Sequence, residues 1–268
     1  MMRLEVNGKK RIIDCRTAFE ARAKLGCEGD IVILNGFQID DDHPLAENDT
    51  LTIIRKGVMP SREELESMMA ARHTPEIHKK LKQGRVAVAG LGGLGSNIAV
   101  MLARIGVGQL LLVDFDVVEP SNLNRQSYYV RHLGMPKALA LQSQLAEINP
   151  FVRIETRSVR VEADNVAGLF AGYDILCEAF DKPDAKAMLV NTALAKLPGI
   201  KVVAASGMAG VASANAIRTA RPLARLYVCG DLATGAAVGT GLMAPRVQIC
   251  AGHQANMVLR LLLGLEDV

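Results

Sequence analysis

The sequence predicts an α/β protein in which a small β-rich domain precedes a doubly wound, mostly parallel sheet. Three observations indicate this fold class. Strand patterns alternate with helical stretches from Arg85 onward, a glycine-rich turn joins the first of these strands to a helix, and short strand-like runs fill residues 1–57. The expected boundaries are 1–57 for the first domain, 58–84 for a helical arm or linker, and 85–268 for the large domain.

Composition and charge exclude several function classes. Of the 268 residues, 50% are hydrophobic, and the formal net charge is only +3 without a basic run. This balance argues against a nucleic-acid partner and against electrostatic binding to a membrane. No run of about 18 apolar residues predicts a membrane-spanning helix, and the N-terminus lacks the apolar core of a signal peptide. We therefore expect a cytoplasmic protein.

The five cysteines are odd in number, lie far apart and form no C-x-x-C pair. Neither a disulfide framework nor a structural zinc site is expected, and a reducing compartment fits. The five histidines also lack metal-ligand spacing, so His73 and His78 are expected on the surface.

Residues 1–57 have the pattern of a small mixed domain. Asn7-Gly8 separates two short strand-like runs, and Asn-Gly is a strong hairpin signal. Thr17 is a candidate cap for a short helix over 18–25. Two more strand-like runs follow at 31–34 and 51–54. The order β-β-α-β-β predicts a compact β-grasp, or ubiquitin-like, domain.

The segment 61–83 is expected to form two helices on either side of Thr74-Pro75. Ser61 begins a capping box with Glu64, and the remaining residues are charged at helical spacing. The pattern is typical of a connecting arm rather than of a core.

The large domain alternates the two kinds of element. Buried strands are expected at 86–89, 110–113, 152–155, 175–177 and 202–205, with helices at 95–105, 135–147 and 183–196. Helices of ten or more residues between strands predict parallel βαβ units. A last apolar helix at 243–263 is expected to cover the sheet or a partner.

A glycine-rich turn, Gly90-Leu91-Gly92-Gly93-Leu94-Gly95, follows the first of these strands and opens a helix. Its glycines let the backbone approach phosphates, and the helix N-terminus supplies free N–H groups and positive potential. Asp114 ends the next strand, where a carboxylate accepts hydrogen bonds from ribose hydroxyls. Together they indicate a nucleotide site on a Rossmann-type sheet, although the loop by itself favours a nicotinamide or flavin dinucleotide.

The residue types in the segment 114–126 distinguish between the possible cofactors. A dehydrogenase needs an apolar path for nicotinamide at this point, whereas the chain supplies Asn122, Arg125 and Gln126, followed by Lys137 at a helix start. Arginine and lysine suit a triphosphate, whose charge must be neutralised before attack at the α-phosphate.

Asp181 follows the strand expected at 175–177, at the carboxyl edge of the sheet, where α/β sites collect. A single carboxylate there suits a hydrated Mg²⁺ that is held jointly with phosphates. These residues therefore predict a nucleoside triphosphate with Mg²⁺, and the family resemblance described next implies that the nucleotide is ATP.

These residues resemble the ThiF/MoeB family, the prokaryotic relatives of ubiquitin-activating enzymes. The resemblance rests on the glycine loop, the pattern D-x-D-x-V-x-x-S-N-L-x-R-Q from Asp114, G-x-P-K ending at Lys137, and Asp181, and it spans residues 62–263. It implies adenylation of the C-terminal glycine of a small carrier protein, with release of pyrophosphate. The nucleotide-binding residues that it implies are Gly92, Gly93, Asp114, Ser121, Asn122, Arg125, Gln126 and Lys137; the catalytic ones are Arg72, Arg125, Lys137 and Asp181, which would also hold the magnesium.

The resemblance also bears on partners. Many members carry an arginine that reaches the nucleotide of a dimer mate, and Arg72 is a loose match, with a solvated helical arginine as the alternative. A homodimer is implied. The N-terminal domain resembles the sulfur carrier ThiS, but it ends at Arg55-Lys56-Gly57-Val58 without a free Gly-Gly tail. It is therefore expected to act as a docking or regulatory mimic rather than as the substrate.

The chain departs from the family pattern at two points. Many relatives hold zinc with two C-x-x-C pairs, which are missing here, so no zinc is expected. Some relatives use a covalent cysteine; Cys177 and Cys250 are expected in the core, and Cys229, before a glycine, is the less implausible candidate. Small residues at 206–210 suggest either a channel for a Gly-Gly tail or a simple tight turn.

Adenylation of a separate ThiS-type sulfur carrier, in thiamine (thiazole) biosynthesis, is the leading function. The alternatives are the same ATP chemistry on another carrier or on a carboxylate of modified tRNA, and a non-catalytic module that binds a carrier. The balanced charge counts against tRNA, and the set of candidate nucleotide contacts counts against a non-catalytic module.

Overall fold

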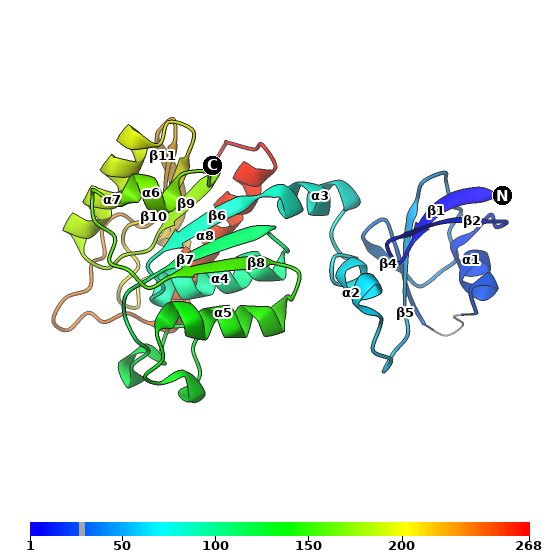
Figure 1. Cartoon of the computed structure of the whole chain (residues 1–268), viewed down its shortest axis with the longest axis horizontal. Coiled ribbons are helices and arrows are strands. Elements are labelled where there is room, and N and C mark those ends of the chain that lie inside the picture. Colours follow the sequence, from blue (N-terminus) through cyan, green and yellow to red (C-terminus); the bar gives the residue numbers. More distant parts are fainter. Residues whose placement is uncertain (27–29) are drawn as a thin grey trace. The chain divides into compact units, whose positions relative to one another are not determined.

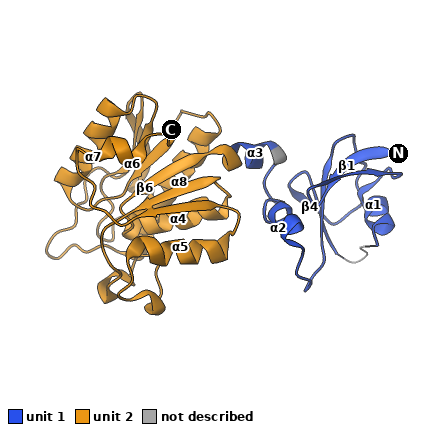
Figure 2. Cartoon of the chain, in the orientation of Figure 1, with its two compact units in different colours: residues 1–80 blue, residues 81–268 orange. Residues whose placement is uncertain are grey.

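The computed structural model describes residues 1–26 and 30–268, which divide into two units, residues 1–80 and 81–268 (Figure 2). Each unit has its own sheet and its own hydrophobic core. The segment 58–84, expected as an arm, is shared between them, because the first unit continues to Lys80. Cys27 lies outside the described residues.

The first unit contains a five-stranded sheet in the order β2-β1-β5-β3-β4 (Figure 1). Asn7 and Gly8 adopt φ values of 49° and 77°, so the predicted hairpin turn is left-handed and joins β1 to β2 in antiparallel register. β5 then pairs with β1 in parallel. The β-grasp prediction is confirmed. The strands are β1 Met2–Val6, β2 Lys9–Ile13, β3 Ile31–Leu34, β4 Phe37–Ile39 and β5 Thr50–Ile54.

Strand β4 is an addition to the predicted order. Asn35 and Gly36 adopt φ values of 47° and 94° and turn the chain back from β3 into β4. This is a second Asn-Gly hairpin, and the same dipeptide signal would have found it. The three residues of β4 are too few to show an alternating pattern.

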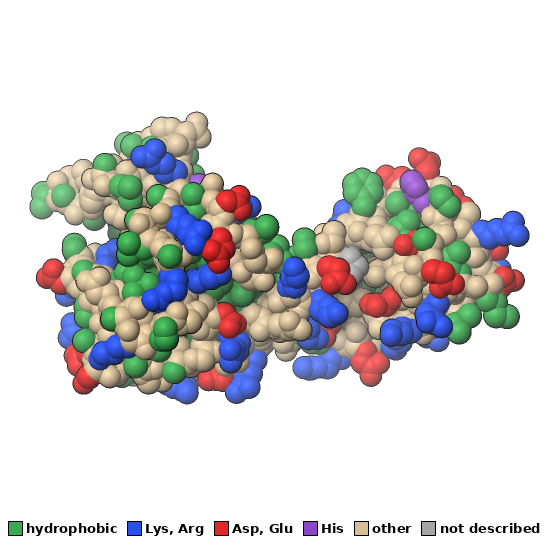
Figure 3. All heavy atoms as spheres, turned by 90° about the horizontal axis from the view of Figure 1, so that it is seen from above, with side chains coloured by type: hydrophobic (Ala, Val, Ile, Leu, Met, Phe, Trp, Pro, Cys, Tyr) green, Lys and Arg blue, Asp and Glu red, His purple; other side chains and the backbone are tan. Residues whose placement is uncertain are grey.

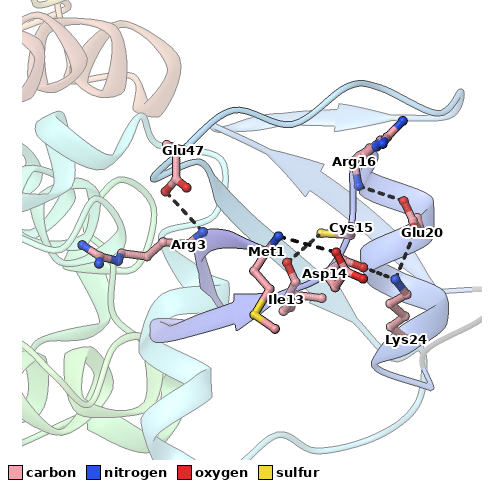
Figure 4. Close-up of polar contacts among 9 residues, drawn as sticks. All are labelled: Met1, Arg3, Ile13, Asp14, Cys15, Arg16, Glu20, Lys24 and Glu47. Atoms are coloured by element: carbon pink, nitrogen blue, oxygen red, sulfur yellow. Dashed lines mark hydrogen bonds and ion pairs between the residues drawn. The ribbon is translucent and has the colours of Figure 1, made fainter.

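Helix α1 (Ala18–Lys24) packs on one face of this sheet, and Thr17 caps it by accepting a hydrogen bond from the Glu20 N–H, as predicted. Several polar contacts lie at the surface around this helix (Figure 4). The Glu20 carboxylate accepts from the Arg16 N–H at 2.8 Å and pairs with Lys24 at 3.0 Å. Because these groups are exposed, solvent screens the ion pair and it adds little to stability.

Helix α2 (Arg62–Met69) lies against β5. Ile33 and Thr52 point away from α1, yet they are only 3% and 2% exposed. Ser61 caps α2 by accepting from the Glu64 N–H at 3.3 Å, which confirms the predicted capping box. The first unit is therefore a sheet with helices on both faces.

The second unit contains a seven-stranded sheet in the order β11-β12-β10-β9-β6-β7-β8, parallel except for β11 (Figure 1). The mostly parallel, doubly wound sheet is thus confirmed. From β6 the chain first adds β7 and β8 on one side and then β9 and β10 on the other side. Ligands of such sheets bind at this point, where the strand order reverses. The strands are β6 Arg85–Ala89, β7 Gln109–Val113, β8 Arg153–Arg157, β9 Ile175–Glu178, β10 Lys201–Ala205, β11 Arg218–Leu223 and β12 Leu226–Gly230.

Helices cover both faces of the large sheet. The core on one face includes side chains of α4, α5 and α8, and the core on the other face includes side chains of α6 and α7. Helix α3 crosses the boundary between the units. The bounds are α3 Pro75–Gln83, α4 Gly93–Arg104, α5 Lys137–Ile148, α6 Val166–Phe170, α7 Pro183–Lys196 and α8 Ala244–Leu262; the short helix α6 was not predicted.

The surface carries both signs of charge. On the face seen in Figure 3, lysine and arginine side chains are interspersed with aspartate and glutamate. Among the described helices, none combines the length and the apolarity needed to cross a bilayer.

Candidate nucleotide site at the carboxyl edge of the large sheet

The glycine loop has the close approaches that require glycine. Gly90 adopts a φ of +88°, and its N–H donates to the Val113 carbonyl at 2.9 Å. A Cβ at Gly90 would lie 2.8 Å from the Ala179 carbonyl oxygen, and one at Gly95 would lie 1.8 Å from the Gly90 oxygen. The loop is therefore wedged between β7 and the end of β9, where a side chain would displace it.

Helix α4 begins at this loop with Gly92 as its N-cap. The Ser96 hydroxyl donates to the Gly92 carbonyl at 2.7 Å, and the Asn97 amide donates to the Gly93 carbonyl at 2.6 Å. The N–H groups of the first turn have no acceptor within the helix, because helix geometry provides none. They and the helix dipole favour an anion at this end of α4.

Asp114 connects the loop to β7. Its Oδ2 accepts from the Leu91 N–H at 2.6 Å and its Oδ1 accepts from the Asp116 N–H at 2.8 Å. The residue is only 9% exposed. Asp114 lies at the end of β7, where the ribose carboxylate is expected. It also holds the glycine loop through the Leu91 N–H, a contact that the sequence did not predict.

The next segment holds Asn122 and Arg125 in fixed positions. The Asn122 Oδ1 accepts from the Glu119 N–H at 3.0 Å, and Asn122 is buried. The Arg125 guanidinium donates to the Ser121 carbonyl at 3.1 Å and to the Asn124 side chain at 2.9 Å. The turn Pro120–Asn122 therefore orients the arginine before any ligand is present.

Arg125 and Gln126 lie beside the glycine loop. A Cβ at Gly93 would be 3.5 Å from the Arg125 Cγ, and one at Gly92 would be 3.8 Å from the Gln126 Nε2. The Gln126 Oε1 and the Arg125 Nε are buried and make no hydrogen bond in the described chain. Buried polar atoms without partners in this position are consistent with a polar ligand or water between them.

Residues outside the predicted set fasten this segment to α4. Asn97 donates to the Arg125 carbonyl at 3.1 Å and accepts from the Ser127 hydroxyl at 2.8 Å, while Ser96 accepts from the Ser127 N–H at 3.0 Å. The Tyr128 hydroxyl donates to the Leu91 carbonyl at 2.8 Å. Burial, and then the Asp114 charge, raise the pKa of Tyr128, so the hydroxyl stays a donor.

Lys137 begins α5 and is nearly buried. Its Nζ lies 3.1 Å from the Asp116 Oδ2, an ion pair that the sequence analysis did not foresee. A lysine at a helix N-terminus is electrostatically unfavourable, and Asp116 offsets this cost. The ammonium is therefore held at the same edge of the sheet as Asp114.

Asp181 follows β9 in an exposed turn whose earlier residues touch the glycine loop. The Ala179 N–H donates to the Ala89 carbonyl at 2.9 Å, and a Cβ at Gly90 would lie 2.9 Å from the Phe180 ring. In the described chain, the Asp181 carboxylate makes no hydrogen bond, and no three acidic, histidine or cysteine side chains cluster as a metal site. One open carboxylate fits Mg²⁺, which usually keeps several waters and takes its other ligands from phosphates.

The family comparison is consistent with this geometry. The ThiF family profile matches residues 65–268, and a ThiS-like ubiquitin profile matches residues 2–57. The chain belongs to the ThiF family. Its first unit is a ThiS-like domain, so both parts of the predicted resemblance are confirmed.

Named relatives of this ThiF protein are adenylyltransferases. Molybdopterin-synthase adenylyltransferase of Salmonella typhimurium is 36% identical over 193 residues, which are 70% of this chain and 76% of that protein. Sulfur carrier protein adenylyltransferase of Thermus thermophilus is 38% identical over 126 residues, 45% of this chain and 46% of that one, so the chain spans less than half of this second relative.

The fold is also found in solved structures. The E. coli tRNA N6-threonylcarbamoyladenosine dehydratase, in complex with ATP, superposes with a TM-score of 0.68 over 77% of this chain and 98% of its own. At 22% identity, this likeness concerns the fold alone.

The ThiF loop 206–210 is held by a buried ion pair. The Arg246 guanidinium donates to the Asp231 carboxylate at 2.6 Å and to the Ala209 carbonyl at 2.9 Å. Burial acts to raise the pKa of Asp231, but hydrogen bonds from Thr234, nearby N–H groups and Arg246 outweigh it and lower that pKa below 3.8. A Cβ at Gly207 would lie 2.1 Å from the Asp231 Oδ1, so the loop closes tightly on this carboxylate. Residues 206–210 thus form a tight turn, and the alternative role, a channel for a Gly-Gly tail, stays a prediction.

The described cysteines of the ThiF unit are all buried. Burial raises the pKa of Cys177, that of Cys229 to about 11 and that of Cys250 to about 12, so each stays a neutral thiol at physiological pH. Thr219 contacts both the Cys229 sulfur, at 3.5 Å, and the His253 Nδ1, at 3.2 Å. This packing favours the core interpretation for Cys229.

Arg72 and the two histidines lie in the first unit, residues 1–80, within the part of it that the ThiF profile also matches. The Arg72 guanidinium donates to the Gln38 side chain at 2.6 Å, within the first unit. The structure therefore gives Arg72 a local partner, and its role toward a dimer mate stays a prediction. His73 and His78 are partly buried rather than on the open surface, with ring centroids 6.2 Å apart, and burial lowers the pKa of His73.

Proposed function

We propose that the chain is an ATP-dependent adenylyltransferase that activates the C-terminal glycine carboxylate of a ubiquitin-like sulfur carrier protein. The observation that carries the proposal is the convergence of the glycine loop, Arg125 and Asp181 at the switch point of the large sheet, in a chain whose relatives are named adenylyltransferases. ATP as the nucleotide is supported by the ATP-bound structural neighbour.

The reaction joins the carrier carboxylate to the α-phosphate of ATP, and pyrophosphate leaves with its bonding electrons. In this proposal the first turn of α4 and Asp114 hold the nucleotide, with ribose hydroxyls donating to the carboxylate. Asn122 and Gln126 orient phosphate oxygens through their amides. Because little covalent chemistry is asked of the protein, positioning and charge neutralisation supply most of the acceleration.

Two cations of the chain act on the phosphates. The Arg125 guanidinium, already oriented by Ser121 and Asn124, offers a planar fork to phosphate oxygens. Lys137 is paired with Asp116 at 3.1 Å, so we propose that its ammonium turns to the phosphates as charge develops on them. Asp181 would hold a magnesium ion together with the phosphates, and such an ion would supply further neutralisation of the leaving pyrophosphate.

The ThiS-like unit points to the carrier class. We propose that the carrier is of the ThiS type, in the formation of the thiamine thiazole, because the first unit resembles such a carrier. Its own residues Arg55-Lys56-Gly57-Val58 run on into α2 and offer no free carboxylate, so we propose a docking or regulatory role for it. A homodimer, a cytoplasmic location and the absence of zinc complete the proposal.

A tRNA-borne carboxylate is the second candidate substrate. The fold likeness to the tRNA dehydratase favours it, and the interspersed surface charge counts against it. A molybdopterin-type carrier is the third, because of the Salmonella typhimurium relative.

One exchange experiment separates these substrates. The purified chain is incubated with ATP, Mg²⁺ and labelled pyrophosphate, alone or with a ThiS-type carrier, a molybdopterin-type carrier or bulk tRNA. Label entering ATP only with the ThiS-type carrier is the expected result. Exchange that depends on another substrate would move the assignment to it, and exchange with none of them would contradict the reaction class.

A further inference from the structure

Lys186 closes the turn that leads to Asp181. It lies in the first turn of α7, and its Nζ is 2.9 Å and 2.8 Å from the two carboxylate oxygens of Glu178 and 3.0 Å from the Phe180 carbonyl oxygen. The Glu178 side chain is fully buried, and its Oε1 also accepts from the Phe180 N–H at 2.7 Å. One ammonium and one carboxylate thus fix the backbone immediately before Asp181.

The same turn forms a wall of the glycine loop. Its Ala179 N–H bonds to β6, and Ala179 and Phe180 both lie where a Cβ at Gly90 would be. From the opposite side, the buried Gln254 amide of α8 donates to the Glu178 carbonyl at 3.1 Å. Because Asp114 and Tyr128 hold the glycine loop independently, through Leu91, a shift of this turn would move Asp181 and leave the loop in place.

Stability alone does not account for the Lys186–Glu178 pair. Burying two charges carries a desolvation cost, and well-packed apolar side chains of similar volume are often as stable or more stable. Burial raises the pKa of Glu178, and Lys186 opposes this rise by favouring the charged carboxylate. The pair holds the Phe180 carbonyl oxygen in place through the Lys186 ammonium, and apolar side chains could not do this.

We propose that Lys186 is a positioning residue of the adenylyl-transfer site, and that it presents Asp181 to the Mg²⁺–ATP complex by holding Glu178 and the Phe180 carbonyl. Lys186 is not a direct phosphate ligand in this proposal, because its Nζ already donates to the Glu178 Oε1 and to the Phe180 carbonyl and lies 2.8 Å from the Glu178 Oε2. The inference rests on the proposed function for the identity of the ligand.

The test measures ATP affinity of the full chain by calorimetry, once with Mg²⁺ and once with EDTA. Lys186→Met is expected to weaken the affinity in Mg²⁺ by about 10-fold or more, as for other residues that orient a metal ligand. The affinity in EDTA should stay at the wild-type value, because the glycine loop and Arg125 are untouched. Lys186→Arg should restore the Mg²⁺-dependent affinity, since arginine can also bind a carboxylate and a carbonyl.

A double variant separates positioning from folding. Lys186→Met leaves Glu178 buried without its cation, which by itself is destabilising. Lys186→Met/Glu178→Gln removes both charges, so it should unfold at the wild-type temperature yet keep the weakened affinity in Mg²⁺. Lys201→Met is the matched control, because it removes a Lys–Glu pair of 2.6 Å at the opposite edge of the sheet; it should leave both affinities unchanged.

Two results would overturn the inference. Wild-type affinity in Mg²⁺ for both Lys186→Met and Lys186→Met/Glu178→Gln would show that Asp181 does not depend on Lys186. An equal loss with and without Mg²⁺ would instead mark Lys186 as a phosphate ligand. A wild-type chain that binds Mg²⁺–ATP but supports no carrier-dependent exchange would overturn the proposed function and leave the role of Lys186 standing.

Discussion

At the residue scale, Arg125 is the side chain whose geometry says most about the chemistry. Its guanidinium is oriented by the Ser121 carbonyl and the Asn124 side chain, and its stem lies beside Gly93. Arginine differs from lysine in offering a planar fork that matches two phosphate oxygens at once. The proposed role therefore depends on the fork as well as on the charge.

Replacement of Arg125 should abolish exchange without unfolding the chain. We expect Arg125→Ala to lower carrier-dependent pyrophosphate exchange by about 100-fold or more, the usual cost of losing one donor to developing charge. Arg125→Lys should restore little of it. Arg104→Ala, at the exposed end of α4, is the control and should retain full activity. Activity of Arg125→Ala equal to that control would show that the fork does not act on the phosphates.

The buried thiols make a second prediction at this scale. The pKa of Cys229 is raised to about 11 and that of Cys250 to about 12, so little thiolate forms below pH 9. In the native protein at pH 8, iodoacetamide should leave Cys177, Cys229 and Cys250 unmodified, and in urea it should modify all three. Peptide mass spectrometry measures both. Rapid native labelling of Cys229 would reopen its candidacy as a covalent residue.

Sequence reasoning found the site residues that have a motif and missed those that depend on tertiary pairing. Asp114, Arg125 and Asp181 belong to patterns that can be read along the chain. Asp116 stands in the same pattern, but nothing along the chain indicates that it pairs with Lys137 at 3.1 Å. Lys186 is an ordinary charged residue until the fold brings it within 2.8 Å of Glu178. No spacing rule predicts such pairs, because each joins two elements whose relative placement follows from the whole sheet.

At the element scale, the loop 206–210 depends on the Asp231–Arg246 pair, which predicts a pH dependence. The pKa of Asp231 is lower in the folded chain than its ordinary value of 3.8. The stability that this shift contributes is present above that value and is lost as the pH falls toward the folded pKa.

Asp231→Asn should therefore destabilise the chain most at neutral pH. We expect a loss of about 3–5 kcal/mol at pH 7, because Arg246 is left buried without its partner. The difference from wild type should shrink at pH 3. Urea unfolding at the two pH values measures it, with Asp267→Asn, an exposed partner of Arg260, as the control. A difference that stays constant with pH would contradict the assigned pKa shift.

Most elements of the fold could be predicted; the antiparallel edge strand β11 and two short elements could not. Continuously apolar strands and helices of 12 or 14 residues between them carry a strong signal, so β6, β7, α5 and α7 lie within a few residues of their predicted bounds. The strand β4 and the helix α6 are too short for a period to be visible. Their signals were local, such as the Asn35-Gly36 turn before β4.

At the scale of the whole molecule, the ThiS-like unit sets this chain apart from a bare ThiF domain. If that unit docks or regulates the carrier, its removal should change carrier binding and leave nucleotide binding intact. We expect a chain lacking residues 1–57 to bind Mg²⁺–ATP with wild-type affinity and to show altered carrier affinity and turnover. Calorimetry with ATP confirms that the ThiF unit is folded, and titration with the carrier gives the readout. Unchanged carrier affinity and turnover would remove the proposed role.

Mass spectrometry of the carrier shows directly whether the chain joins AMP to the carrier carboxylate. The purified chain, Mg²⁺–ATP and a ThiS-type carrier are mixed with pyrophosphatase, which keeps the reaction from reversing. The expected product is a carrier heavier by one AMP, which should not form when the carrier lacks its final glycine or when the chain carries Asp181→Ala. A carrier that stays at its original mass while the chain binds ATP would show that the chain does not adenylate this carrier.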